Sequence, residues 1–320
     1  MCAVVLAVGR DSSKFIALAC INIVISANAG GVFCPFGDIT TLMVWQKGIV
    51  PFQSFLLLFA PSLVNWLVPA AIMYFFLPNA MPKSIDEEVA LRRGARRIVF
   101  LFLLTIATAF AFENILHLPA AMGMMLGMAY LQFFAYFLKS SYGKDRRIAS
   151  RRTAESSSER RANDRRNSSL VGDSPFDVFS RVSRAEWDTL LFFYGVILCV
   201  GGLGFIGYLN MASEIMCGEW GATRTNIAVG LVSALVDNIP VMFAVLSMEP
   251  YMSQGQWLLV TLTARVGGSL LSIGSAAGVA LMGQARGHYT FMSHLRWIPV
   301  IALGYAASIM VHIWLNESMF

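Results

Sequence analysis

Two stretches of the chain decide its fold: ANAGGVFCPFGD at residues 27–38 and ARVGGSLLSIGS at residues 264–275. Each carries a glycine pair and a third glycine six positions after that pair. Corresponding glycines lie 237 positions apart, since 267 minus 30 and 274 minus 37 give the same offset. Glycine disfavours a helix interior by about 1 kcal/mol relative to alanine, so each stretch is expected to interrupt a helix. The expected helix breaks are Gly30, Gly31, Gly37, Gly267, Gly268 and Gly274.

The sequence around both stretches is too apolar for a water-soluble domain. Hydrophobic residues make up 57% of the 320 residues and charged residues 13%, whereas about 25% of a typical soluble domain is charged. The mean hydropathy is +0.62. These values exclude a soluble globule, an intrinsically disordered protein and a small secreted scaffold. We therefore expect an all-α, polytopic membrane protein with two broken transmembrane helices.

Apolar segments of about 20 residues, the length that crosses a bilayer, give the expected organisation. Residues 1–78 form the end of a first repeat, with a broken helix at 15–45 and a span at 52–77. Residues 79–139 add two connecting spans after a basic flank, and residues 140–186 are a loop rich in Ser and Arg. Residues 187–320 form a second repeat, with a span at 189–209, a hairpin at 226–248, a broken helix at 257–282 and a span at 297–315.

Basic residues orient these spans. The flank at 79–97 and the loop at 140–186 concentrate Lys and Arg, and cytoplasmic loops of membrane proteins carry that excess. We therefore expect a multi-pass protein of a bacterial inner membrane, with the Ser/Arg-rich loop in the cytoplasm. The loop lacks interleaved aromatic residues and lies between two spans, so nucleic acid is not expected as a partner. The lipid bilayer is an expected partner, and the sequence leaves a homodimer open.

The two broken helices are expected to cross the membrane in opposite directions. Four crossings separate them if segment 226–248 enters and returns on one side as a re-entrant hairpin. This arrangement is an inverted repeat, which many secondary transporters use to build a substrate site near the bilayer midplane. Unwound backbone at that depth is tolerated where it lines a cavity or is buried in protein.

Polar residues at the breaks could hold a small cation. Ionisable groups inside membrane segments are costly, and they mark ion pathways by default. Asp38 and Asp237 supply carboxylates, which are hard oxygen ligands of the kind that a small cation prefers. The same residues have an alternative explanation. The aspartates would cap half-helices, and the Ser and Thr hydroxyls would hydrogen-bond helix carbonyls. The expected cation- or proton-binding residues are Asn28, Asp38, Thr40, Thr41, Asp188, Asp237, Asn238, Ser269, Ser272 and Ser275.

Three segments resemble the signature segments of the NhaD-type sodium/proton antiporters. They read NAGGVFCPFGDITTLMVWQKG from residue 28, SALVDNIPVMFAVLSMEP from residue 233 and GGSLLSIGSAAGVALMGQARG from residue 267. The resemblance implies exchange of cytoplasmic Na+ or Li+ for external protons, without a cofactor and without enzymatic chemistry. It also implies functional roles for the polar residues just named, Ser269 being the least directly supported.

Two departures from the family pattern carry further expectations. Position 265 is small in the family, but here it is Arg265, which should pair with Asp38 or Asp237 and take the place of the cation. The family also has an Asp-Asn pair before the first broken helix. Asp237 precedes Gly267 by 30 positions, and the same step back from Gly30 falls just before Met1. We therefore expect an N-terminal repeat to be missing from this chain.

Other classes of function remain open from the residues alone. An intramembrane aspartyl protease would use Asp38 and Asp237 as a pair sharing a proton. A small-anion permease of the same superfamily would turn half-helix N-termini toward its substrate. A truncated membrane protein that transports nothing is a third alternative.

Overall fold

The structure is a computed structural model that describes residues 2–9, 12–77, 95–116, 118–137, 187–214 and 220–320. Regular secondary structure within these residues is helical. Five helices among them are long and apolar enough to cross a membrane: Ser13–Gly30, Phe52–Tyr74, Arg96–Asn114, Ala120–Phe137 and Ile298–Leu315. The predicted all-α, multi-pass architecture is therefore confirmed. The Ser/Arg-rich loop at 140–186 and most of the basic flank at 79–97 lie outside the described residues.

The chain divides into two compact units, Met1–Glu87 with Asp188–Phe320 and Glu88–Trp187. In the second unit α6 (Ala95–Asn114) packs against the helix Ala120–Phe137 through small residues. A Cβ atom on Gly123 would lie 2.5 Å from the Cα of Ala109, and one on Gly127 would lie 2.0 Å from the Thr105 side chain. Close approach at small residues is a common way for membrane helices to pack.

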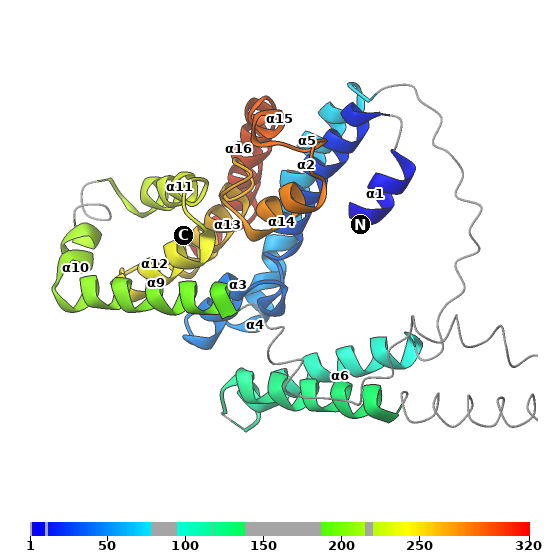
Figure 1. The fold of residues 1–320 in the computed structure, drawn as a ribbon. Coiled ribbons are helices and arrows are strands. Elements are labelled where there is room, and N and C mark those ends of the chain that lie inside the picture. Colours follow the sequence, from blue (N-terminus) through cyan, green and yellow to red (C-terminus); the bar gives the residue numbers. More distant parts are fainter. Residues whose placement is uncertain (1, 10–11, 78–94, 117, 138–186, 215–219) are drawn as a thin grey trace, which may run out of the picture. The chain divides into compact units, whose positions relative to one another are not determined.

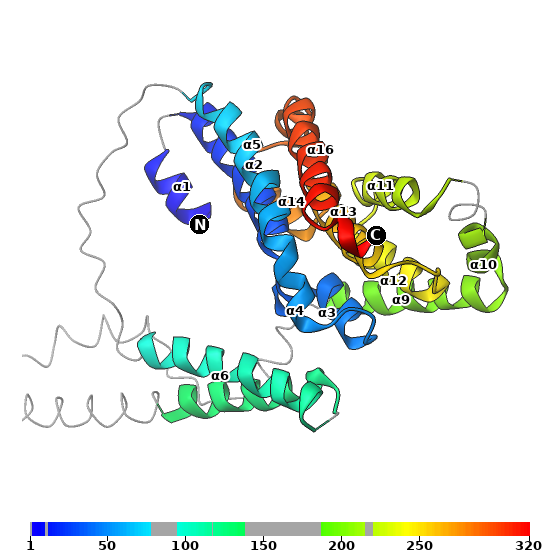
Figure 2. The same cartoon turned by 180° about the vertical axis from the view of Figure 1, so that it is seen from behind.

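The first unit begins with α1 (Cys2–Val8) and the first broken helix, α2 (Ser13–Gly30) and α3 (Ile39–Gln46), with the turn η1 (Pro35–Gly37) between them. Ser12 caps α2 by accepting a hydrogen bond from the Phe15 amide. The short helix α4 (Phe52–Phe55) and the turn η2 (Leu56–Leu58) lead into α5 (Phe59–Tyr74). α5 lies beside α2 in both ribbon views (Figures 1 and 2).

The rest of this unit carries the second broken helix, α13 (Gln254–Gly267) and α14 (Ala276–Gln284). It is preceded by α9 (Trp187–Phe205), α10 (Tyr208–Ser213), α11 (Ala222–Ser233) and α12 (Asn238–Met248). It is followed by α15 (Phe291–Leu295), α16 (Ile298–Leu315) and the turn η5 (Glu317–Met319).

One expected span differs in the structure. We predicted a continuous segment from 189 to 209, but α9 ends at Phe205 and α10 starts at Tyr208. Gly207 separates them with a φ of 92°, a left-handed conformation that glycine adopts readily. α9 itself is 19 residues long.

The core of the first unit lies around α13, of which nearly every residue is buried. α11 packs along α13, and a Cβ on Gly267 would lie 2.0 Å from the carbonyl oxygen of Gly230. The Ser233 hydroxyl donates to the Ala264 carbonyl at 2.6 Å, and the Thr263 hydroxyl donates to the Asn226 carbonyl at 2.7 Å. α16 packs along α5 in the same close manner, with Gly304 against the Asn65 backbone.

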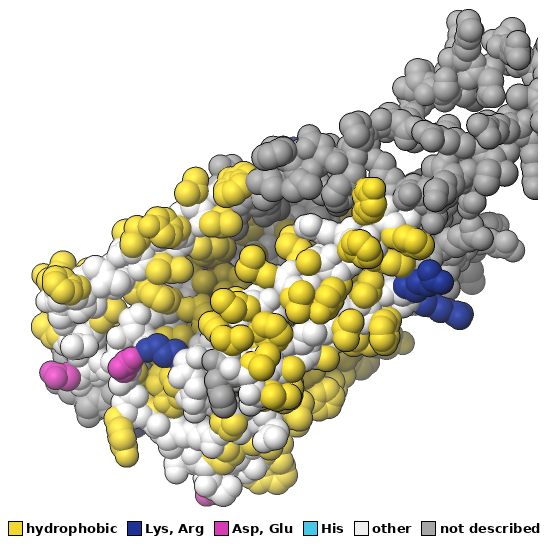
Figure 3. Space-filling view, turned by 90° about the horizontal axis from the view of Figure 1, so that it is seen from below, with side chains coloured by type: hydrophobic (Ala, Val, Ile, Leu, Met, Phe, Trp, Pro, Cys, Tyr) yellow, Lys and Arg dark blue, Asp and Glu magenta, His cyan; other side chains and the backbone are white. Residues whose placement is uncertain are grey.

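The described surface is largely apolar. Hydrophobic side chains cover much of the face shown in Figure 3, and charged side chains are few on it. Phe75 is 83% exposed and Trp314 75% exposed. Monomeric soluble proteins rarely expose apolar patches of this extent, so this surface suits contact with lipid.

Candidate cation site

The two aspartates begin neighbouring helices. Asp38 is the N-cap residue of α3 and Asp237 is the N-cap residue of α12, and these two helices pack against each other. The other ends of the same helices carry Lys47 and Glu249, which form an ion pair. α3 and α12 therefore run side by side in the same direction. The positive ends of both helix dipoles stabilise negative charge at the aspartates.

Asp38 is held by two groups. Its Oδ2 atom accepts a hydrogen bond from the Thr40 hydroxyl at 2.7 Å and pairs with Nη1 of Arg265 at 2.8 Å. Arg265 lies in the last turn of α13, so this ion pair joins the second broken helix to the first. From the sequence alone, either Asp38 or Asp237 could be the partner of Arg265. The structure selects Asp38, and Asp237 lies near enough to interact electrostatically with both other groups.

Thr41 gathers backbone oxygens next to Asp38. Its buried hydroxyl lies 3.2 Å from the Cys34 and Pro35 carbonyl oxygens and 2.9 Å from that of Asp38. One hydroxyl donates a single proton, and the Cys34 and Asp38 carbonyls also accept from the backbone amides of Gly37 and Leu42, at 2.8 and 3.1 Å. The turn between α2 and α3 thus concentrates oxygen acceptors, which are the ligands of small hard cations.

Several buried polar side-chain atoms at the two breaks and at the start of α12 have no hydrogen-bond partner within the described part of the chain. They are Oδ1 of Asn28, Oδ1 of Asp237, Nδ2 of Asn238 and Nε of Arg265. An unsatisfied buried polar group costs about 1–3 kcal/mol, so these atoms require further partners, which water or an ion can supply. Two of the four atoms are oxygens that can bind a cation. Atoms of Ser62 and Asn65 in α5 are unpaired in the same way.

Asn28 and Ser275 form a contact that matches the Arg265–Asp38 pair. The Asn28 amide donates to the Ser275 hydroxyl at 3.1 Å, and Ser275 is the N-cap residue of α14. Asn28 precedes Arg265 by 237 positions, and Asp38 precedes Ser275 by the same number. In both contacts, a residue in the last turns before one break reaches the N-cap residue after the other break.

The glycines bring the two ends of each break together. A Cβ on Gly37 would lie 2.5 Å from the carbonyl oxygen of Gly31, and one on Gly268 would lie 2.6 Å from that of Gly274. Gly31 and Gly37 are the counterparts of Gly268 and Gly274 at the offset of 237. Both breaks therefore have the same internal contact, which a larger residue would prevent. Gly30 and Gly267 end α2 and α13, respectively.

The serines of the second break connect to a histidine that the sequence analysis did not identify. His294 is fully buried, and its Nε2 lies 2.9 Å from the Ser269 carbonyl. A carbonyl only accepts, so Nε2 carries the proton and Nδ1 accepts from the Tyr289 hydroxyl at 2.8 Å. The Tyr289 hydroxyl also interacts with the Ser272 side chain. No spacing or motif in the sequence distinguishes these two residues from solvated loop residues.

The pH dependence of stability is expected to report on His294. α15 connects α14 to α16 outside the candidate spans, and burial lowers the pKa of His294 from its ordinary 6.5. Below that value the unfolded chain binds more protons than the folded chain, so the free energy of unfolding falls as the pH drops. The melting temperature of the His294→Gln variant should therefore fall less than that of the unsubstituted chain when the pH is lowered from about 7.5 to about 5.5.

His288→Gln is the matched control, because His288 lies in the same connection but contacts Ser13 at a more exposed position. It should keep the full decline. An equal decline in the His294 variant would contradict the prediction.

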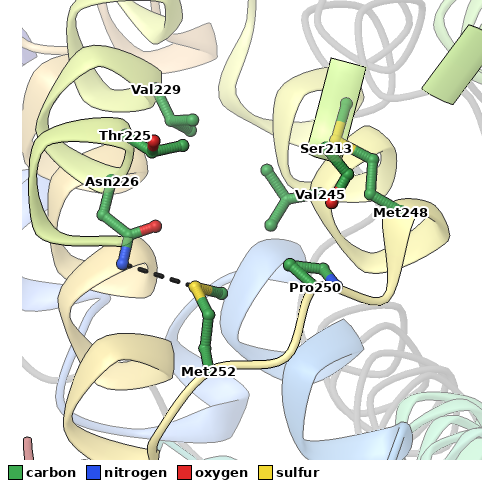
Figure 4. A pocket seen from close by; sticks show the side chains of 8 residues that line it. All are labelled: Ser213, Thr225, Asn226, Val229, Val245, Met248, Pro250 and Met252. Carbon is green, nitrogen blue, oxygen red and sulfur yellow. Dashed lines mark hydrogen bonds between the residues drawn. The ribbon is translucent and has the colours of Figure 1, made fainter. Parts of the chain in front are cut away.

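Two features lie apart from these contacts. Asp188 is the second residue of α9, and its side chain is outside the described part of the structure. A small cavity of about 40 Å³ lies between α10, α11 and α12 (Figure 4), where the Asn226 amide faces the Met252 sulfur at 3.6 Å. None of the predicted site residues lines this cavity.

Comparisons with known proteins identify the class. A family model described as "Citrate transporter" matches residues 1–265. The chain is therefore a multi-pass membrane protein of a transporter family and is not an enzyme, which contradicts the intramembrane protease alternative. No solved structure matches it significantly.

Three relatives narrow the class. The Na(+)/H(+) antiporter NhaD of Alkalimonas amylolytica is 60% identical over 324 residues, covering 100% of this chain and 65% of that protein. NhaD of Vibrio parahaemolyticus is 62% identical over 310 residues, covering 96% of this chain and 73% of that protein. Sodium/proton antiporter 1 of Arabidopsis thaliana is 30% identical over 313 residues, covering 93% of this chain and 48% of that protein. The chain belongs to the NhaD family of Na+/H+ antiporters. It spans about 65% of the length of the first of these relatives.

Proposed function

We propose that this chain carries the ion site of a secondary transporter that exchanges Na+ or Li+ for protons. The observation that carries the proposal is the pair of aspartates, Asp38 and Asp237, at the adjoining starts of α3 and α12. Around them are oxygen acceptors that lack donors among the described residues. The relatives' printed names, which specify Na+/H+ antiport, support the same conclusion.

The chemistry that fits this site is competition between a cation and protons for the same carboxylates. An ionised carboxylate in a membrane segment is costly unless a charge neutralises it, and either Na+ or a proton can do so. When Na+ is bound, Asp237 and the free oxygen of Asn28 are suited to ligate it, with the Thr40 hydroxyl and the carbonyls near Thr41 as further oxygens. When Na+ leaves, protonation of the carboxylates removes the same charge. Asn238, Ser269, Ser272, Ser275 and Asp188 complete the proposed set.

An inverted repeat is part of the proposal, with 1–78 and 187–320 as its two parts and 226–248 as a re-entrant hairpin. The reciprocal contacts Asn28–Ser275 and Arg265–Asp38 support it, because they relate positions at one constant offset. The shared glycine contacts of the two breaks support it as well. The short lengths of α11 and α12 suit a hairpin that enters and returns on one side.

For the location, we propose a bacterial inner membrane with the loop at 140–186 in the cytoplasm. The basic residues of that loop and of the flank at 79–97 support this orientation. The bacterial sources of the NhaD relatives support the membrane type.

Everted membrane vesicles provide the direct test. The vesicles are acidified by respiration, and Na+ or Li+ is then added while a fluorescent dye reports the pH gradient. Cation-induced loss of the gradient in vesicles carrying this chain, absent from vesicles without it, would support antiport. Unchanged fluorescence at every cation concentration and pH, with the chain present in the membrane, would contradict it.

A small-anion permease is the second candidate function. Helix N-termini of α3, α12 and α14 and the guanidinium of Arg265 are groups that bind anions. Two of those N-termini, however, are capped by aspartates, which repel an anion. Uptake of a labelled carboxylate without cation-induced proton release would favour this candidate.

A further inference from the structure

Arg265 is a positive charge built into the proposed cation site. Its side chain is 12% exposed and that of Asp38 16%, and the pair is closed at 2.8 Å. The guanidinium also lies against the glycine pair of the first break: a Cβ on Gly31 would be 3.2 Å from Nη2. Arg265 thus reaches across from α13 into the turn that presents the oxygen acceptors.

The matching position in the other repeat is neutral. Asn28 stands where Arg265 stands, at the offset of 237, and it contacts Ser275 where Arg265 contacts Asp38. An amide facing the aspartate would leave one carboxylate charge free. The arginine neutralises that charge within the protein instead.

The net charge of the centre formed by Asp38, Asp237 and Arg265 therefore depends on the residue at position 265. Asp38, Asp237 and Arg265 sum to one negative charge, whereas the two aspartates alone carry two. A monovalent cation that approaches Asp38 must displace a guanidinium already paired with it, and like charges at such short range repel strongly.

We propose, resting on the antiport function above, that Arg265 is a tethered competitor of Na+ for Asp38. It keeps Asp38 occupied and leaves Asp237 as the carboxylate open to a monovalent cation. Sodium gains access to Asp38 when the guanidinium withdraws. Arg265 thereby sets the sodium concentration at which the site fills.

Binding and exchange of three single variants test this proposal. Arg265→Asn copies Asn28, Arg265→Gly removes the side chain, and Arg265→Lys keeps a charge at the same place. Equilibrium binding of radioactive ²²Na+ to the purified chain in lipid nanodiscs gives the half-saturating concentration. Na+-induced proton release in everted vesicles is measured in parallel.

Arg265→Asn and Arg265→Gly should lower the half-saturating sodium concentration by roughly tenfold or more. The Coulomb energy between two charges in direct contact is larger than the free energy that corresponds to a tenfold change in affinity, so losing part of it is enough. Arg265→Lys should stay near the unsubstituted chain. The gain should vanish in the double variant Asp38→Asn, Arg265→Asn, which locates it at Asp38. Both neutral variants being equal to or weaker than the unsubstituted chain in sodium binding would overturn the inference.

The two readouts separate this inference from the proposed function. Tighter ²²Na+ binding in the neutral variants without proton release in any vesicle would uphold the competitor role and refute antiport. Proton release with unchanged sodium affinity in the neutral variants would support antiport and refute the competitor role. If one neutral variant fails to fold, the other still decides the outcome, and melting with and without Na+ identifies the folded one.

Discussion

Asp237→Asn is expected to abolish Na+-induced proton release in everted vesicles while the chain still inserts into the membrane. An amide cannot carry the negative charge that either Na+ or a proton neutralises, so the exchanged charge is lost. The Oδ1 atom of Asp237 is buried and unpartnered among the described residues, and asparagine occupies nearly the same volume. The fold should therefore persist while exchange falls to background. Asp38→Asn should do the same, with the added cost of an unpaired Arg265.

Glu249→Gln is the matched control at the other end of α12. Glu249 is exposed, and the hydrogen bond and charge of Lys47 hold its pKa below the ordinary value, so it stays ionised at neutral pH. Exposed ion pairs contribute little to stability. This variant should exchange ions normally. Near-normal exchange by Asp237→Asn in the same preparation would refute the role assigned to that carboxylate.

Gly278→Ala is expected to disrupt the second break. Gly278 lies in the first turn of α14, and a Cβ there would lie 2.0 Å from the carbonyl oxygen of Ser272. Backbone atoms cannot move aside as a flexible side chain can, so the turn that carries Ser272 must shift. Overpacking of this kind typically costs about 1–3 kcal/mol, occasionally more. We expect a lowered melting temperature in detergent and strongly reduced exchange.

Gly283→Ala separates this steric effect from a general effect of alanine. Gly283 lies in the same helix, and a Cβ there would meet nothing within 4 Å. Since alanine favours a helix over glycine, this variant should melt at the same or a higher temperature. Equal melting of the two variants would show that the contact at Gly278 is not tight.

The sequence was informative wherever the signal is local. Glycine pairs and a shared offset marked both breaks, because helix interiors disfavour glycine whatever the tertiary context. The cost of charge in apolar segments drew attention to Asp38 and Asp237. The same cost required a partner for Arg265, but the choice of Asp38 depends on how α13 meets α3, which no local pattern encodes.

The parts of the site that could not be predicted are those made by packing. Tyr289 and His294 lie in a short polar connection, and their burial against Ser269 and Ser272 follows from the fold of the whole unit. The end of α9 at Phe205 depends on a left-handed Gly207, one of several nearby glycines that could have ended the helix. Hydropathy alone does not distinguish between them.

The paired contacts Asn28–Ser275 and Arg265–Asp38 have a kinetic consequence. Both join the same two broken helices, so a motion that separates these helices must break the two contacts together. In the exchange proposed above, we expect these two contacts to slow the reorientation of the centre when no ion is bound. A bound cation can replace the guanidinium of Arg265 as the partner of Asp38 and so release one of the two contacts, and we therefore expect the loaded centre to move more readily. An exchanger needs this difference, because each turnover of an empty carrier dissipates the gradient that drives it.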